Sequence, residues 1–194
     1  MRKVLTGLVV LFVCSWASPP SKADGNAPSA AAPSLEEACK TVYTDCRVDH
    51  TVQLRLADGS EYKKTIALSY PPVKNGTFVT IFPGESLRLE ATLEGDRITA
   101  LKTASPTADP ARTIGIELKQ TDGKADMTLI VTNPFPHVLK YRAGIQVRAD
   151  DDLRKTSSCG VMAGISGIES WRYPVYEVAM TDFRLLPDDN LVCE

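Results

Sequence analysis

The strongest constraint on the fold is a run of apolar residues that recur at every second position near residue 140. This run places the following residues on one side of an extended chain: Leu139, Tyr141, Ala143, Ile145 and Val147. Successive side chains of a strand point to opposite faces, so the period predicts a strand with one buried face. Shorter alternations of the same kind predict strands around residues 52–56, 87–93 and 114–118.

Short turn signals separate the predicted strands. The pairs Asp58-Gly59, Asn75-Gly76 and Asp122-Gly123 combine residues that tolerate the positive φ angles of tight hairpin turns. About nine or ten strands without a long crossover helix predict an all-β fold with antiparallel sheets. We therefore expect an antiparallel two-sheet sandwich, and we interpret the polar segment 104–112 as a loop within it.

This pattern resembles an immunoglobulin-like sandwich in general character. The cysteine spacing around a core tryptophan that marks antibody-type domains is missing, because Cys159 and Cys193 both lie late in the chain with Trp171 between them. A resemblance at the level of the fold implies no function.

The C-terminal strand changes its buried face. Tyr176, Val178 and Met180 share one face, whereas Phe183 and Leu185 fall on the other. A strand cannot change its buried face without an extra residue. We expect a bulge or bend near Thr181-Asp182.

Residues 1–23 have the features of a secretory signal peptide. Basic residues precede a short apolar run, and small residues allow cleavage after Ala17 or Ala23. The run is far shorter than the roughly 20 residues of a membrane-spanning helix, so no transmembrane segment is expected. Cys14 lies where a lipoprotein would be acylated, but Val13 before it is larger than that processing prefers. We interpret Cys14 as part of the signal.

The rest of the chain divides into a tether and a folded region. Residues 24–34 contain Pro, Ala and Ser without a large apolar side chain, which predicts a flexible tether. Ser34 and Glu37 have capping-box spacing, which predicts a short helix from Leu35 to about Val42. Since 43% of the chain is hydrophobic, we expect residues 35–194 to form a single β-sandwich domain that includes this helix.

The cysteines predict a disulfide framework. Four remain after the signal: Cys39, Cys46, Cys159 and Cys193. An even number in a chain bound for an oxidising compartment predicts two disulfides, and three pairings are possible. We favour Cys39 with Cys46 and Cys159 with Cys193, because each pair closes locally. The spacing of a zinc ribbon is missing, so neither a metal nor a cofactor is expected, and the acidic runs 150–152 and 188–190 are interpreted as solvated turns.

The net charge limits the classes of partner. Cleavage after Ala23 removes three cations and no acid, which changes the formal net charge from −2 to −5. An acidic product has no basic field to attract nucleic acid or an anionic membrane surface. We expect a secreted or periplasmic protein whose partner is a protein or a glycan at the cell envelope.

Segment 158–178 is the most unusual stretch of the chain. Three glycines lie in it, but the lysine of a phosphate-binding loop is missing and Pro174 prevents a regular helix soon after. We interpret the segment as a loop fixed by Cys159, with Ile165 and Ile168 packed inward.

The aromatic residues of this segment are the candidate binding residues. Trp171 and Tyr173 stand two positions apart in an extended segment, so they are expected to point the same way. They either cap the core or form an exposed aromatic platform. With Arg172 between them, Trp171 and Tyr173 make up the predicted binding site.

The preferred function is a non-catalytic binding or structural module that acts at the cell envelope, and not an enzyme. One alternative is a secreted serine hydrolase that uses Ser166 with His137 or His50. A second alternative is a protein inhibitor of an extracellular enzyme that presents the loop 160–173.

Overall fold

The computed structural model describes residues 34–43, 45–186, 191 and 193–194. The predicted signal peptide, the tether up to residue 33 and the acidic run 188–190 lie outside the described residues. Within the described residues, no helix is both long and apolar enough to cross a membrane.

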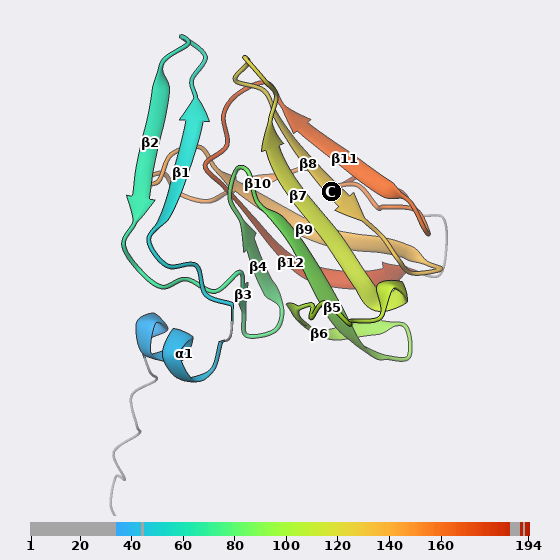
Figure 1. Ribbon diagram of the computed structural model, residues 1–194. Helices are drawn as coiled ribbons and strands as arrows, with labels where there is room; N and C mark the ends of the chain where they lie inside the picture. Colours follow the sequence, from blue (N-terminus) through green and yellow to red (C-terminus); the bar gives the residue numbers. More distant parts are fainter. Residues whose placement is uncertain (1–33, 44, 187–190, 192) are drawn as a thin grey trace, which may run out of the picture. The chain divides into compact units, whose positions relative to one another are not determined.

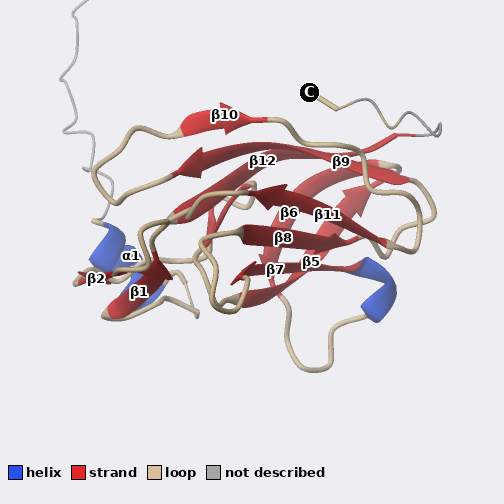
Figure 2. Ribbon diagram, turned by 90° about the horizontal axis from the view of Figure 1, so that it is seen from above, coloured by secondary structure: helices blue, strands red, loops and turns tan. Residues whose placement is uncertain are grey.

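The described residues form two five-stranded antiparallel sheets that pack face to face, with a separate two-stranded hairpin beside them (Figures 1 and 2). The first sheet has the order β10 (Arg154–Thr156), β9 (Val138–Gln146), β12 (Glu177–Leu186), β4 (Phe78–Ile81), β3 (Val73–Lys74). The second has the order β11 (Ser166–Trp171), β8 (Met127–Thr132), β7 (Thr113–Gln120), β5 (Ser86–Glu94), β6 (Arg97–Thr103). The hairpin consists of β1 (His50–Arg55) and β2 (Glu61–Ile66).

This architecture confirms the predicted two-sheet sandwich. The described residues contain twelve strands instead of the expected nine or ten. Two of them, β3 and β10, have two and three residues and are too short to show a period of two. The polar segment 104–112 connects β6 to β7 in one sheet and holds a short 3-10 helix, Pro110–Arg112.

The long strands lie where alternation predicted them, and their apolar sides form the core. Leu139, Tyr141, Ala143 and Ile145 of β9 are all buried. Across the sandwich they face the buried alternating residues of the second sheet, such as Ile114, Ile116 and Leu118 of β7.

The predicted irregularity of the C-terminal strand is confirmed. The pairing of β12 with β9 shifts register between Thr181 and Arg184, and Asp182 has a positive φ of 55°. The extra residue returns Phe183 and Leu185 to the buried face, where they are 7% and 9% exposed.

The tight turn between β3 and β4 of the first sheet contacts the edge of the second sheet. Asn75 and Gly76 have φ angles of 52° and 66°, as the sequence predicted for this pair. The turn brings the carbonyl of Gly76 to the edge strand β6, where it accepts a hydrogen bond of 2.6 Å from the backbone N–H of Leu101.

The N-terminal helix and both disulfides agree with the sequence predictions. Helix α1 spans Leu35–Thr41, and the hydroxyl of Ser34 accepts a hydrogen bond from the backbone N–H of Glu37 at 3.2 Å. Cys39 is bonded to Cys46 and Cys159 to Cys193, which is the favoured local pairing.

A buried ion pair anchors the segment that leads into the hairpin. The guanidinium of Arg47 donates to both carboxylate oxygens of Glu85, at 2.5 and 2.6 Å. It also donates to the carbonyl of Thr80 and lies 4.9 Å from the ring centre of Phe82. The two charged side chains are only 8% and 16% exposed, so each depends on the other for compensation of its buried charge.

The interpretation of segment 158–178 as one loop is wrong in its second half. Residues 166–171 form the edge strand β11, which pairs with β8. Ile165 and Ile168, expected to pack inward, are 45% and 70% exposed. The buried Trp171 fixes the phase of this strand, so Gly167 and Glu169 share its inward face and Ile168 points outward.

Candidate functional site

One end of the sandwich gathers four connections from distant parts of the chain. They are the β1–β2 turn, the β7–β8 turn, the β9–β10 connection and the corner between β11 and β12. We call this group the loop end. The side-chain amide of Gln120 helps to assemble it, because its oxygen accepts from the backbone N–H of Arg55 and its nitrogen donates to the carbonyl of Arg55, both at 2.8 Å.

The surface of the loop end is hollowed. A hollow of 500 Å³ lies between the β1–β2 turn, the β7–β8 turn and Arg172. A second, of 300 Å³, shares residues 56–58 with the first and extends to Arg148 and Pro174. A third, of 450 Å³, shares Val147 with the second and reaches Tyr173. The three hollows therefore adjoin one another across the loop end.

Basic side chains predominate around these hollows. Six line them, all on exposed residues: Arg55, Lys124, Arg148, Arg154, Lys155 and Arg172. Two acids, Asp58 and Asp126, are the acidic lining residues. In the described part of the chain, none of the six cations forms a salt bridge with a carboxylate. Their charges are available to an anionic ligand.

Two acids of the loop end, Asp58 and Asp151, are held by hydrogen bonds within their own turns. The hydroxyl and the backbone N–H of Ser60 both donate to Asp58, at 2.6 and 2.9 Å, and these hydrogen bonds lower the pKa of Asp58. Asp58 is thus held by its own turn. Asp151, in the neighbouring acidic run, accepts from the backbone N–H of Arg148, which is the behaviour expected of a turn residue.

The structure separates the three predicted binding residues. Trp171 is 8% exposed, and its indole N–H donates to the hydroxyl of Thr156 at 3.1 Å, so it belongs to the core. Arg172 is exposed and lines the first hollow, and Tyr173 is 43% exposed and lines the third. Trp171 and Tyr173 therefore do not form one aromatic platform.

Five of the six cations were missed in the sequence. Arg148 directly follows the alternation that ends at Val147, and Arg55 lies between Leu54 and Leu56 on the polar side of β1. Arg154 and Lys155 lie in the short strand β10, and Lys124 follows the turn glycine Gly123. These five residues share a position at or beside a strand end. That position indicates a common site only when the structure shows which strand ends lie together.

Ser166 has a threonine as its partner. Its hydroxyl is hydrogen bonded to that of Thr132 on the neighbouring strand at 2.8 Å. His137 has its Nε2 3.7 Å from Asp96, and His50 has its Nδ1 3.8 Å from Glu85. The hydrolase alternative requires a hydrogen bond between Ser166 and one of the two histidines. Among the described contacts, neither histidine makes that hydrogen bond.

A buried polar cluster lies behind β11. The carboxylate of Glu169 accepts hydrogen bonds from the hydroxyl of Tyr141 at 3.2 Å and from the backbone N–H of Cys159 at 3.0 Å. Burial raises the pKa of Glu169, and these hydrogen bonds oppose the shift only in part. Lys140 donates to the carbonyl of Ser158 at 2.5 Å, and burial lowers its pKa.

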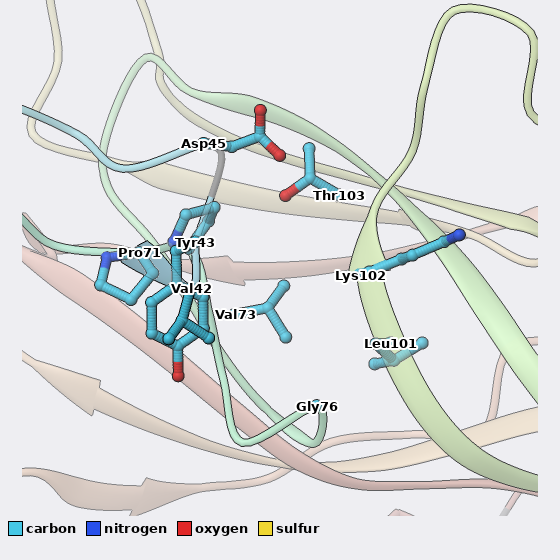
Figure 3. A pocket seen from close by; sticks show the side chains of 10 residues that line it. Val42, Tyr43, Asp45, Pro71, Val73, Gly76, Leu101, Lys102 and Thr103 are labelled. Carbon is cyan, nitrogen blue, oxygen red and sulfur yellow. The ribbon is translucent and has the colours of Figure 1, made fainter. Parts of the chain in front are cut away.

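A separate cavity of 270 Å³, which we call the cavity beyond α1, is lined by Val42 and Tyr43 directly after that helix and by residues of β3 and β6 (Figure 3). Val73 and Leu101 form part of its wall and are almost fully buried. Its lining lysine, Lys102, is paired with Glu90 at 3.0 Å. The wall of this cavity combines apolar side chains with the polar residues Asp45 and Thr103, and it lacks the group of unpaired cations found at the loop end.

Comparisons with protein-family models, with curated proteins and with solved structures found no match to this chain.

Proposed function

We propose that the protein is a secreted or periplasmic, non-catalytic binding module whose loop end holds an anionic partner at the cell envelope. The observation that supports this proposal is the set of six basic side chains around three adjoining hollows, without salt bridges to the described carboxylates. These six cations outnumber the two acids of the lining, Asp58 and Asp126, so the hollows carry an excess of positive charge that favours an anionic ligand.

The chemistry of the lining defines the class of partner. Arginine presents a planar group that binds carboxylate, sulfate or phosphate oxygens in pairs, and Arg55, Arg148 and Arg172 offer this from three different connections. Tyr173 adds an exposed aromatic face at the third hollow. The partner is therefore a protein or glycan that carries several anionic groups along its length.

The disulfides and the signal-like N-terminal sequence support the proposed compartment. Two disulfides are typical of proteins that fold in an oxidising environment.

A wide, exposed loop end on a sandwich is suited to binding a large partner, because loops carry recognition while the sheets fix their positions.

Isothermal titration with two probes tests this proposal. A sulfated or carboxylated oligosaccharide and an acidic peptide represent the glycan and the protein sources of anionic groups. We expect one of them to bind, with affinity that falls as salt concentration rises. Arg172→Glu should weaken binding by about tenfold or more, which corresponds to about 1.4 kcal/mol.

The matched control is Arg97→Glu, an exposed arginine on β6 that lines none of these hollows. It makes the same change in net charge and should leave binding within about twofold, since a surface charge outside the contact acts only at long range. Equal losses for the two variants would contradict a site at the loop end.

A further inference from the structure

The edge strand β11 has an open backbone edge. β11 pairs with β8 on one side and has no other strand beside it among the described residues. The carbonyl of Ile165 accepts from the backbone N–H of Asn133, so the alternation of an antiparallel ladder directs Gly167, Glu169 and Trp171 toward β8. The backbone N–H and C=O of Ser166, Ile168 and Ser170 therefore point away from β8.

The other edges of the sandwich are short, partly covered or carry charged residues, as β6 does with Arg97 and Lys102. The edge of β6 receives the carbonyl of Gly76, and the edge of β9 is covered by β10 and by the bridge between Leu139 and Val161. β10 has three residues, two of which are the charged Arg154 and Lys155. Short strands and charges protect edges from pairing, and β11 has neither protection on its outward face.

The outward residues of β11 are uncharged and symmetric. Ser166, Ile168 and Ser170 are exposed, and Ile168 is 70% exposed. The acid of the strand, Glu169, points inward and already accepts hydrogen bonds from Tyr141 and Cys159. An added strand therefore meets no charge on the outward face, and the Glu169 carboxylate lies on the opposite face of the strand.

We propose that β11 is a self-association edge, at which two copies of the chain pair antiparallel about a two-fold axis through Ile168. This register places Ser166 opposite Ser170 of the second copy, Ile168 opposite its own equivalent, and Glu169 opposite Gly167. The polar, apolar, polar order reads the same in both directions, which is the complementarity that a two-fold contact requires. The β11-containing sheet of each copy has five strands, and the pairing joins these two sheets into one continuous sheet of ten strands.

The size of the edge sets the strength of the contact. β11 has six residues, so the pairing is smaller than a standard protein interface. We expect a reversible dimer with a dissociation constant of roughly 10–1,000 µM.

Sedimentation velocity across that concentration range, on protein expressed from the full chain, tests the proposal. The wild-type protein should shift from monomer to dimer. Ile168→Lys, which adds a like charge at the two-fold axis, should remain monomeric. Ile168→Pro should do the same and stay folded, because it removes an N–H that points away from β8. Val48→Lys, at an apolar position of similar exposure (68%), should dimerise as the wild type does.

Amide hydrogen exchange supplies a second measurement. The N–H of Ile168 should exchange rapidly in dilute protein and at least about fivefold more slowly at high concentration, whereas the N–H of Glu169 should be protected at both. A wild-type protein that stays monomeric throughout overturns the proposal. So does a dimer that Ile168→Lys leaves unchanged, or an Ile168 amide whose exchange is independent of concentration.

Discussion

The side chain of Gln120 takes the place of a neighbouring strand for Arg55. Its amide makes both backbone hydrogen bonds that a paired strand would make to that residue, each at 2.8 Å. The contact joins the end of β1 to the end of β7, which are 65 residues apart in the sequence. Through it the separate hairpin and the second sheet share one wall of the largest hollow at the loop end.

Gln120→Ala should therefore loosen the hairpin tip without unfolding the sandwich. We expect a loss of about 1–2 kcal/mol in the free energy of unfolding, because two partly solvated hydrogen bonds are removed. Hydrogen exchange should rise in residues 55–60. Gln53→Ala, which removes a 3.3 Å contact with Glu61 within the hairpin, should leave the exchange of these residues unchanged.

The Arg47–Glu85 pair should be essential for attachment of the hairpin segment. Arg47→Met leaves the Glu85 carboxylate buried without its cation, and we expect a loss of about 3–5 kcal/mol in chemical denaturation. Arg88→Met, at an exposed arginine of β5, should cost less than about 0.5 kcal/mol. A double variant Arg47→Met/Glu85→Met that loses the full sum of the two single losses would show that the two residues are not coupled.

The sequence predicted the sandwich well because apolar residues alternate along its long strands. The alternation in β9, the turn at Asn75-Gly76 and the bulge at Asp182 all follow from local rules on face, φ and register. The local disulfide pairing was also predicted. These features depend on neighbours within a few residues or on one period of the pattern.

Features that depend on tertiary cover were not predictable in this way. Lys140 lies on the polar side of β9 but is 1% exposed, because Ser158 lies over it. Ile168 is exposed because Trp171, and not the isoleucines, sets the phase of β11. The loop end joins cations from four connections, and one-dimensional spacing contains no information on which strand ends meet.

Glu169 should make stability depend on pH. Burial raises the pKa of Glu169 in the folded protein above its ordinary value of 4.5, so the folded state binds a proton that the unfolded state releases. Its contribution is therefore most favourable below pH 4.5 and is lost as pH rises through the folded pKa. Glu169→Gln should gain stability relative to the wild type over that rise.

Thermal or urea unfolding between about pH 4 and pH 8 measures this difference. The contrasting variant is Glu36→Gln, since the hydrogen bond and charge of Lys40 lower the pKa of Glu36. It should show a smaller trend of opposite sign. A Glu169→Gln variant that tracks the wild type at every pH would show that Glu169 titrates alike in both states.

Alanine variants of Trp171 and Tyr173 should distinguish a residue that packs in the core from one that contacts the partner. Trp171→Ala empties a core site and should lower the free energy of unfolding by about 3–5 kcal/mol. Tyr173→Ala removes an exposed ring, should change stability by less than about 0.5 kcal/mol and should weaken binding of an anionic partner. A thermal melt and a titration on both variants decide between these roles. A large stability loss in Tyr173→Ala would remove Tyr173 from the binding surface.

Backbone amide chemical shifts during titration with a sulfated or carboxylated oligosaccharide, or with an acidic peptide, locate the site directly. We predict that the largest shifts occur at residues 55–59, 123–126, 147–148, 154–156 and 172–173, and that they diminish as salt is added. Residues around the cavity beyond α1 should be unaffected. Saturable shifts confined to that cavity, or no shift with either probe, would contradict an anion-binding loop end.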